Sequence, residues 1–141
     1  CEESSETIDS INILEATRLC MKRAVEGLSV QPDVVFTDGN FRLQIDLPQQ
    51  NIVRGDALSY TIGAASILAK VYRDALMCEY DKLYPQYGFA VHKGYGTKRH
   101  TDAIREYGLC EIHRRTFTKK FWERAESAGE QNTLNPSGTK F

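Results

Sequence analysis

Two aspartates of the sequence lie where carboxylates commonly bind metal. Asp38 follows the apolar run VVFT (residues 34–37), and Asp56 lies just beyond the run NIVR (residues 51–54). If these runs are neighbouring parallel strands, both carboxylates emerge at one edge of a sheet, where open α/β sheets place their ligands. Carboxylates that converge there repel one another unless a cation lies between them, and oxygen ligands favour Mg²⁺ or Mn²⁺. The alternative is that each aspartate only caps a turn beside its glycine.

A second candidate is the stretch HKGYGTKRH, residues 92–100, which surrounds a tyrosine with glycines and cations. Glycine lets the backbone approach a surface closely, and lysine and arginine contact phosphates without reading sequence. Residues 91–124 hold nine Lys/Arg and four Asp/Glu, so a phosphate-rich partner would prefer this half. A solvated basic face is the alternative. The candidate binding residues are Lys93, Gly94, Tyr95, Gly96, Lys98 and Arg99.

The histidines and cysteines do not match a zinc site, because no HExxH motif or paired Cys/His finger occurs. His92, His100 and His113 are expected to be exposed or hydrogen-bonded. The four cysteines have no CxxC pair, which indicates reduced thiols and a cytoplasmic location. No apolar run approaches the ~20 residues of a membrane span. Neither a GxSxG elbow nor a Walker A loop is present.

The elements that must position these residues follow from hydrophobic periodicity. Apolar residues at helical spacing predict helices over residues 7–27 and 60–83, and a shorter helix over 101–107 that Gly108 closes. A basic helix is predicted from residue 116 to about 128. Strands between helices favour an α/β or α+β layer, although two strands are few for a stable sheet. The length of 141 residues fits about one domain.

Five segments occur in the order INILEATRLCMKRAVEGL, VVFTDGN, VRGD, IGAASILAKVYRD and YGFAVHKGYGTKRHTDAIREYGLCEIHRRTF. Together they closely resemble type 2 ribonuclease H, most of all its bacterial ribonuclease HII branch. The resemblance implies that residues 6–117 form a ribonuclease HII-like catalytic domain. Residues 118–128 would form a basic helical extension, and residues 129–141 have the composition of a disordered tail.

The resemblance implies an RNase H-like α/β fold and an endonuclease. Such an enzyme hydrolyses the RNA strand of RNA–DNA hybrids and cuts at ribonucleotides embedded in duplex DNA, by a two-metal mechanism. Asp38 matches the third of the family's four metal-binding carboxylates and Asp56 the fourth. Tyr95 matches the tyrosine that packs against the ribonucleotide at the RNA–DNA junction, which places it beside the metal site. Lys93, Lys98 and Arg99 would contact phosphates.

The family's opening strand, with its Asp-Glu pair and Gly-Arg-Gly loop, has no match in this sequence. We therefore expect the later part of a ribonuclease HII, with half of the carboxylates and weak or no activity by itself. A sheet without its first strands exposes apolar surface and unpaired backbone. This predicts self-association, or complementation by the N-terminal segment.

Two other functions remain possible from the sequence. One is a non-catalytic module that binds RNA–DNA hybrids through Tyr95 and the basic residues. The other is a different nuclease of the same fold superfamily, against which the KGYGT stretch argues. The segment QNTLN (residues 131–135) faintly resembles a sliding-clamp ligand but lacks the closing hydrophobic residues, so a plain tail is expected there.

Overall fold

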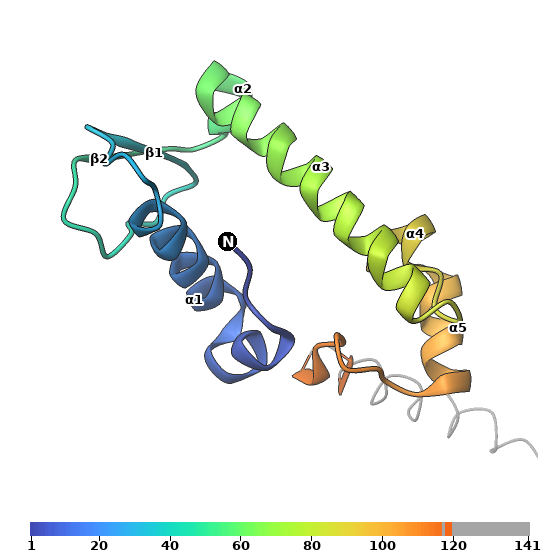
Figure 1. Ribbon diagram of the computed structural model, residues 1–141. Coiled ribbons are helices and arrows are strands. Elements are labelled where there is room, and N and C mark those ends of the chain that lie inside the picture. Colours follow the sequence, from blue (N-terminus) through green and yellow to red (C-terminus); the bar gives the residue numbers. More distant parts are fainter. Residues whose placement is uncertain (117, 120–141) are drawn as a thin grey trace, which may run out of the picture.

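A computed structural model describes residues 1–116, 118 and 119 of the chain (Figure 1). Most of the predicted basic helix (residues 116–128) and the whole predicted tail lie outside these residues. A long helix runs between two ends of the molecule, with a small sheet near its start and two short helices near its finish. The elements are α1 (Ser5–Glu26), β1 (Val35–Asp38), β2 (Gln49–Ile52), α2 (Gly55–Leu58), α3 (Tyr60–Leu83), α4 (Phe89–His92) and α5 (Lys98–Tyr107).

The sheet consists of β1 and β2, which pair in parallel with Val35 opposite Gln49 and Asp38 opposite Ile52. The expectation of two neighbouring parallel strands is confirmed, with bounds that differ by one and two residues from the predicted ones. A short apolar, β-branched run such as VVFT is typical of a buried strand, but this expectation is wrong in part. Thr37 is buried, but the Phe36 side chain is 41% exposed, because the described elements do not cover both faces of the sheet.

Helix α1 contains a break that the periodicity did not predict. It starts at Ser5, and the Ser4 hydroxyl accepts a hydrogen bond from the Thr7 amide at 3.1 Å. Asn12 has φ 68° and ψ 165° inside the helix. Its side-chain oxygen accepts from the amides of Leu14 and Glu15, so it caps the second half of the helix. Asparagine is suited to such a cap because its short side chain reaches nearby backbone amides.

Helix α3 has the predicted bounds, and its start packs closely against α2. A Cβ added at Gly63 would lie 3.0 Å from the Asp56 carbonyl oxygen, so a small residue is needed there. The predicted apolar stripe along the helix does not form a core face. Leu68 and Tyr72 are mostly exposed, whereas Ile62 and Met77 are buried. The described elements contact α3 near its start and along its second half, which leaves the middle uncovered.

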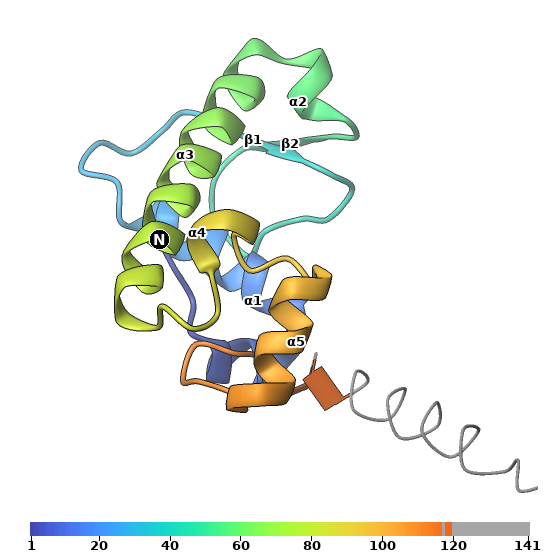
Figure 2. The ribbon, with the colours of Figure 1, turned by 90° about the vertical axis from the view of Figure 1, so that its right-hand side faces the viewer.

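The main hydrophobic core is formed by the buried residues Tyr87, Phe89, Ala103 and Ile104. Phe89 belongs to α4, and Ala103 and Ile104 belong to α5. Both helices follow α3 in the chain and lie near its end (Figure 1 and Figure 2). Helix α5 begins three residues before the predicted start, because the Thr97 hydroxyl accepts from the His100 amide and caps it at Lys98. It ends at Gly108, as predicted, with φ 77°. This core supports the loop between α4 and α5, which carries Lys93, Gly94, Tyr95 and Gly96 of the predicted binding residues, and the first turn of α5, which carries Lys98 and Arg99.

The segment after α5 joins the start of α1. The Ser5 hydroxyl donates to the Glu111 carbonyl at 3.0 Å, and the Arg115 amide donates to the Asp9 carboxylate at 2.7 Å. Among the residues that the structure describes, no helix is long and apolar enough to cross a membrane.

Candidate active site and nucleic-acid surface

The carboxylate edge is the place where β1, β2 and α2 meet, and it contains Asp38 and Asp56. The Asp38 Oδ1 atom accepts a hydrogen bond from the Gly55 amide at 2.8 Å. The Gly39 amide donates to the Ile52 carbonyl at 3.0 Å, so the carboxyl ends of both strands are joined. Because Asp56 directly follows Gly55, the structure brings both predicted aspartates to one edge of the sheet.

Gly55 makes this arrangement sterically possible. An added Cβ would lie 2.7 Å from Ile62 Cδ1 and 3.4 Å from Asp38 Cα. Ile62 is buried in the first turn of α3, so its methyl group has little room to move. Glycine therefore lets the end of β1 and the start of α3 approach one another.

The two aspartates differ in how they bind the backbone. The Asp56 Oδ1 atom accepts from the amide of the next residue, Ala57, which is the local turn contact that the alternative interpretation expects. Asp38 accepts from a residue seventeen positions away, so its bond joins two elements and does not cap its own turn. Both side chains are exposed, and their oxygens are the hard donors that Mg²⁺ and Mn²⁺ prefer.

The loop between α4 and α5 presents Tyr95 on a fixed backbone. Lys93 and Gly94 have φ values of 52° and 81°, and the Tyr95 amide donates to the His92 carbonyl at 2.8 Å. A Cβ added at Gly94 would lie 3.5 Å from an Arg73 guanidinium nitrogen, whereas one added at Gly96 would meet nothing within 4 Å. The Tyr95 side chain is 63% exposed. A backbone held in this way projects the ring outward.

The three predicted phosphate-binding cations have different surroundings. The Lys93 ammonium donates to the Cys78 sulfur at 3.0 Å and to the Asp74 carbonyl, so it fastens the loop to α3. Lys98 pairs with Asp102 at 2.6 Å on the surface of α5. The Arg99 guanidinium lies against Gly88, where an added Cβ would be 3.0 Å from Nε. Lys98 and Arg99 therefore face the outside of the molecule, while Lys93 contacts protein.

The structure does not bring Tyr95 to the carboxylate edge. Asp56 contacts α3 at Gly63, whereas Gly94 approaches it at Arg73 and Met77. Ten to fourteen helical residues separate these contacts, which at 1.5 Å per residue amounts to about 15–20 Å. The resemblance implied that the Tyr95 ring lies directly beside the carboxylates. In this arrangement of the chain it does not.

Three histidines form a buried group that sequence reasoning did not identify. The rings of His92 and His100 stack with centroids 4.3 Å apart, and the Nε2 atoms of His100 and His113 are 3.0 Å apart. Burial lowers the pKa of His100. Burial, together with the neighbouring His100, lowers the pKa of His113 to about 4. The expectation of hydrogen-bonded histidines is confirmed. Their convergence depends on the turn after α5, which periodicity does not predict.

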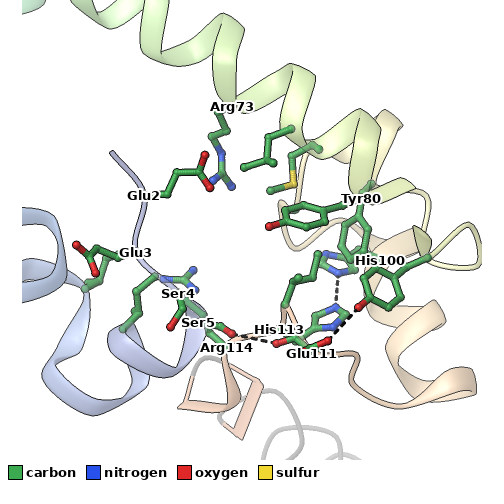
Figure 3. A pocket seen from close by; sticks show the side chains of 18 of the residues that line it. Glu2, Glu3, Ser4, Ser5, Arg73, Tyr80, His100, Glu111, His113 and Arg114 are labelled. Carbon is green, nitrogen blue, oxygen red and sulfur yellow. Dashed lines mark hydrogen bonds between the residues drawn. The ribbon is translucent and has the colours of Figure 1, made fainter. Parts of the chain in front are cut away.

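A cavity of about 1220 Å³ separates the start of α1 from the second half of α3 and the histidine group (Figure 3). Glu2, Glu3 and Ser5 lie on one side, and Arg73, Tyr80 and His100 lie on the other. The walls belong to elements that are far apart in the sequence. The cavity therefore marks the space that the described elements leave between α1 and α3.

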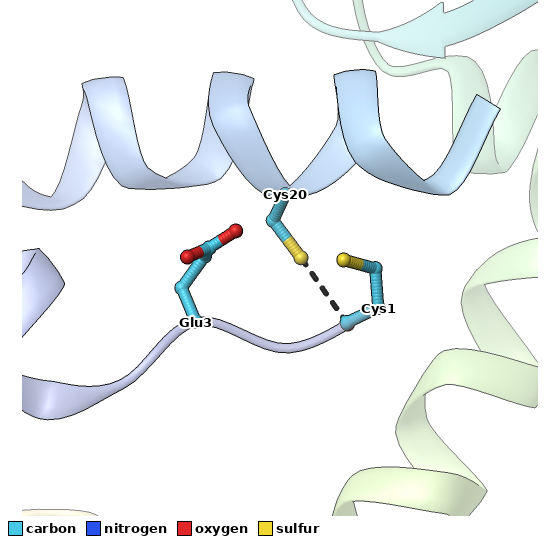
Figure 4. A group of neighbouring side chains, drawn as sticks. All are labelled: Cys1, Glu3 and Cys20. Atoms are coloured by element: carbon cyan, nitrogen blue, oxygen red, sulfur yellow. Dashed lines mark hydrogen bonds between the residues drawn. The ribbon is translucent and has the colours of Figure 1, made fainter. Parts of the chain in front are cut away.

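One group of three possible metal ligands occurs within the described residues: Cys1, Glu3 and Cys20 (Figure 4). The Glu3 carboxylate forms a two-oxygen ion pair with Arg23, at 2.8 and 2.9 Å. The Cys20 thiol donates to the Cys1 carbonyl, and burial raises the pKa of this thiol. Because a nearby cation already neutralises the carboxylate and the thiol favours its protonated form, the group does not have the character of a metal centre. Both cysteines are free thiols, as predicted.

The fold and the site together define an α/β protein with two carboxylates at the carboxyl edge of a parallel sheet. The chain belongs to the ribonuclease HII family, whose model matches residues 2–125.

Curated relatives agree with this assignment. Proteins named Ribonuclease HII match from Desulfitobacterium hafniense (strain DSM 10664 / DCB-2), with 58% identity over 110 residues, and from Acetivibrio thermocellus, with 55% over 114. A third, from Pelodictyon phaeoclathratiforme, has 50% identity over 117 residues. The matches cover 78%, 81% and 82% of this chain, and 42%, 44% and 57% of the respective relatives. The chain thus spans about half the length of the curated relatives it matches.

Proposed function

We propose that the chain is part of an endoribonuclease that hydrolyses the RNA strand of RNA–DNA hybrids and cuts at ribonucleotides embedded in duplex DNA. The observation that carries the proposal is the hydrogen bond from the Gly55 amide to Asp38, which holds Asp38 at the same sheet edge as Asp56. Family membership supports it. In this proposal residues 6–117 form the catalytic domain, with an RNase H-like fold of which β1 and β2 are part.

The carboxylate edge would hold Mg²⁺ or Mn²⁺ through Asp38 and Asp56. A divalent cation bound there would supply the means to lower the pKa of a water nucleophile and to stabilise the leaving 3′ oxygen, and a second cation would share this task. The protein's own contribution is geometric. The Gly55 amide fixes the orientation of the Asp38 carboxylate, and Gly63 allows the Asp56 backbone to pack on α3.

Tyr95 and the surrounding basic residues would bind the duplex. Lys98 and Arg99 carry exposed positive charge, which gives affinity for phosphates without sequence preference. Tyr95 would pack against a sugar at the RNA–DNA junction, since the ring projects from a glycine-flanked loop. A duplex rises about 3.4 Å per base pair, so the 15–20 Å between ring and carboxylates corresponds to about five base pairs. For a single RNA–DNA junction to contact both Tyr95 and the carboxylates, the end of the molecule formed by α4 and α5 would have to approach the sheet.

We also propose that the chain associates with a second copy or with a further segment of a ribonuclease HII. The middle of α3 exposes Ile67, Leu68 and Val71, each by more than 60%, which is unusual for a helix in a folded domain. Gel filtration at several concentrations tests this proposal. We expect an apparent mass that rises with protein concentration. When the N-terminal part of a relative is added, we expect a single species whose apparent mass no longer depends on concentration. A concentration-independent monomer would contradict the proposal.

The catalytic proposal is tested with a DNA duplex that carries one ribonucleotide, in the presence of Mn²⁺. We expect slow cleavage at the ribonucleotide, abolished by Asp38→Asn while duplex binding persists. Asp46→Asn, an exposed aspartate in the segment between β1 and β2, is the matched control and should cleave like the parent chain. Binding without any cleavage would favour the alternative of a non-catalytic hybrid-binding module.

A further inference from the structure

The buried histidines are joined to the backbone on both sides of Tyr95. The Gly94 amide donates to His92 Nδ1 at 3.2 Å, and His92 Nε2 lies 2.8 Å from the Tyr87 carbonyl oxygen. His100 Nδ1 lies 3.0 Å from the carbonyl oxygen of Tyr95 itself. The imidazoles of His92 and His100 therefore hold the backbone of Gly94 and of Tyr95, respectively.

The hydrogen-bond partners fix the tautomer of each ring. His92 must carry its proton on Nε2, because a carbonyl faces this atom and an amide faces Nδ1. His100 must carry its proton on Nδ1, which donates to a carbonyl, so its Nε2 atom accepts. His113 Nδ1 accepts from the Cys110 amide at 3.0 Å, so its proton is on Nε2 and is donated to His100.

We propose that His92, His100 and His113 form a relay of neutral imidazoles that positions Tyr95, and that a proton added to any of the three releases the loop. Each added proton would replace an acceptor by a donor that faces another donor. On His100 it would face the His113 N–H, on His113 the Cys110 amide, and on His92 the Gly94 amide. These histidines act as positioning residues in the substrate binding that we propose above, on which this inference rests.

The surroundings of the relay favour its neutral form. Phe89 has its ring centroid 5.4–5.7 Å from those of all three histidines, and Tyr87 packs edge-on against His113. Burial lowers the pKa of both His100 and His113 and raises that of the neighbouring Cys110 thiol. Other titratable or charged groups line the adjoining cavity near the relay, and they include Arg73, Tyr80, Tyr84, Glu111 and Arg114. The Arg73 guanidinium donates to the Lys93 carbonyl at 3.2 Å, so it also contacts the loop.

Nitrogen-15 NMR of the chain tests the relay without any substrate. We expect long-range ¹H–¹⁵N spectra at pH 7.5 to show Nε2–H, Nδ1–H and Nε2–H tautomers for His92, His100 and His113, in that order. On acidification, the amide signals of Gly94 and Tyr95 should move together with the titration of His100. An Nε2–H tautomer at His100, or titration of His100 without movement of the Tyr95 amide, would overturn the proposal.

A matched pair of variants links the relay to binding. His100→Asn keeps a side-chain donor where Nδ1–H stands but cannot be protonated, whereas His100→Phe keeps only an aromatic ring. We expect affinity for a ribonucleotide-containing duplex, measured by fluorescence anisotropy, to fall more steeply in wild type than in His100→Asn below pH 6, and to be reduced at every pH in His100→Phe. Equal pH profiles for wild type and His100→Asn would contradict the claim that a proton on His100 releases the loop. If no protein binds the duplex at any pH, the proposed function fails while the NMR result still decides the relay.

Discussion

The carboxylate edge differs from the histidine end of the molecule (α4, α5 and the buried residues His92, His100 and His113) in how its geometry is fixed. Asp38 and Asp56 are placed by backbone hydrogen bonds and by two sterically required glycines, Gly55 and Gly63, among side chains that are largely exposed. Tyr95 is placed by a loop whose support is a buried aromatic core and three buried imidazoles. The comparison suggests that the histidine end is held by its own contacts, whereas the carboxylate edge depends more on what packs against it.

The largest expected effect that tests this comparison comes from deletion of an aromatic ring at each end. Phe89→Ala removes a buried ring that contacts all three histidines, and should lower the free energy of unfolding by about 3–5 kcal/mol. Phe36→Ala in β1 removes a ring that is 41% exposed, and should cost less than about 1.5 kcal/mol. Urea unfolding measures both values. Similar losses would remove the difference between the two ends.

Acidification should weaken the histidine end selectively. The pKa of His113 is lowered to about 4 in the folded chain, so between pH 6.5 and about 4 the unfolded chain binds a proton that the folded chain does not. Stability should therefore fall over this range, by about 3 kcal/mol for this residue if the whole shift is expressed. Thermal unfolding across this range measures the loss.

The control for this titration is His113→Gln, which keeps a side-chain donor toward His100 and cannot titrate. Its stability should change less between pH 6.5 and pH 4 than that of the wild type. An unchanged slope would assign the pH dependence to other groups.

A smaller effect distinguishes two glycines with different neighbours. Gly55→Ala places a methyl group against Ile62 at the carboxylate edge and should cost about 1–3 kcal/mol of stability. Gly96→Ala meets open space and should change stability by less than about 0.5 kcal/mol. It should still weaken duplex binding if Gly96 lies against the groove. Equal stability losses would show that the packing around Gly55 is not as tight as its contacts indicate.

Local sequence signals predicted elements better than they predicted packing. The bounds of α3, the parallel pairing of β1 with β2, and the cap at Gly108 follow from periodicity, strand type and turn residues, all of which act over a few positions. The break at Asn12 was missed because the apolar spacing continues through it. The exposure of Leu68 was missed because periodicity indicates an apolar face and does not show what covers it.

The candidate site divides in the same way. Asp38 and Asp56 could be brought to one edge from sequence, since each follows a strand and parallel strands end together. The distance from Tyr95 to that edge could not be predicted from the sequence, because it depends on where along α3 the loop packs. The histidine relay could not be predicted either, because His113 reaches it through the turn after α5, and the sequence pattern does not determine the path of that turn.

Divalent cation binding at the carboxylate edge tests the central claim most directly. Electron paramagnetic resonance measures free Mn²⁺ during titration into the wild-type chain and into Asp38→Asn, Asp56→Asn and the control Asp46→Asn. We predict that the first two substitutions each weaken Mn²⁺ affinity by at least about tenfold, or about 1.4 kcal/mol, and that the control retains wild-type affinity. Equal Mn²⁺ affinity in all four proteins would contradict the claim that Asp38 and Asp56 share a cation.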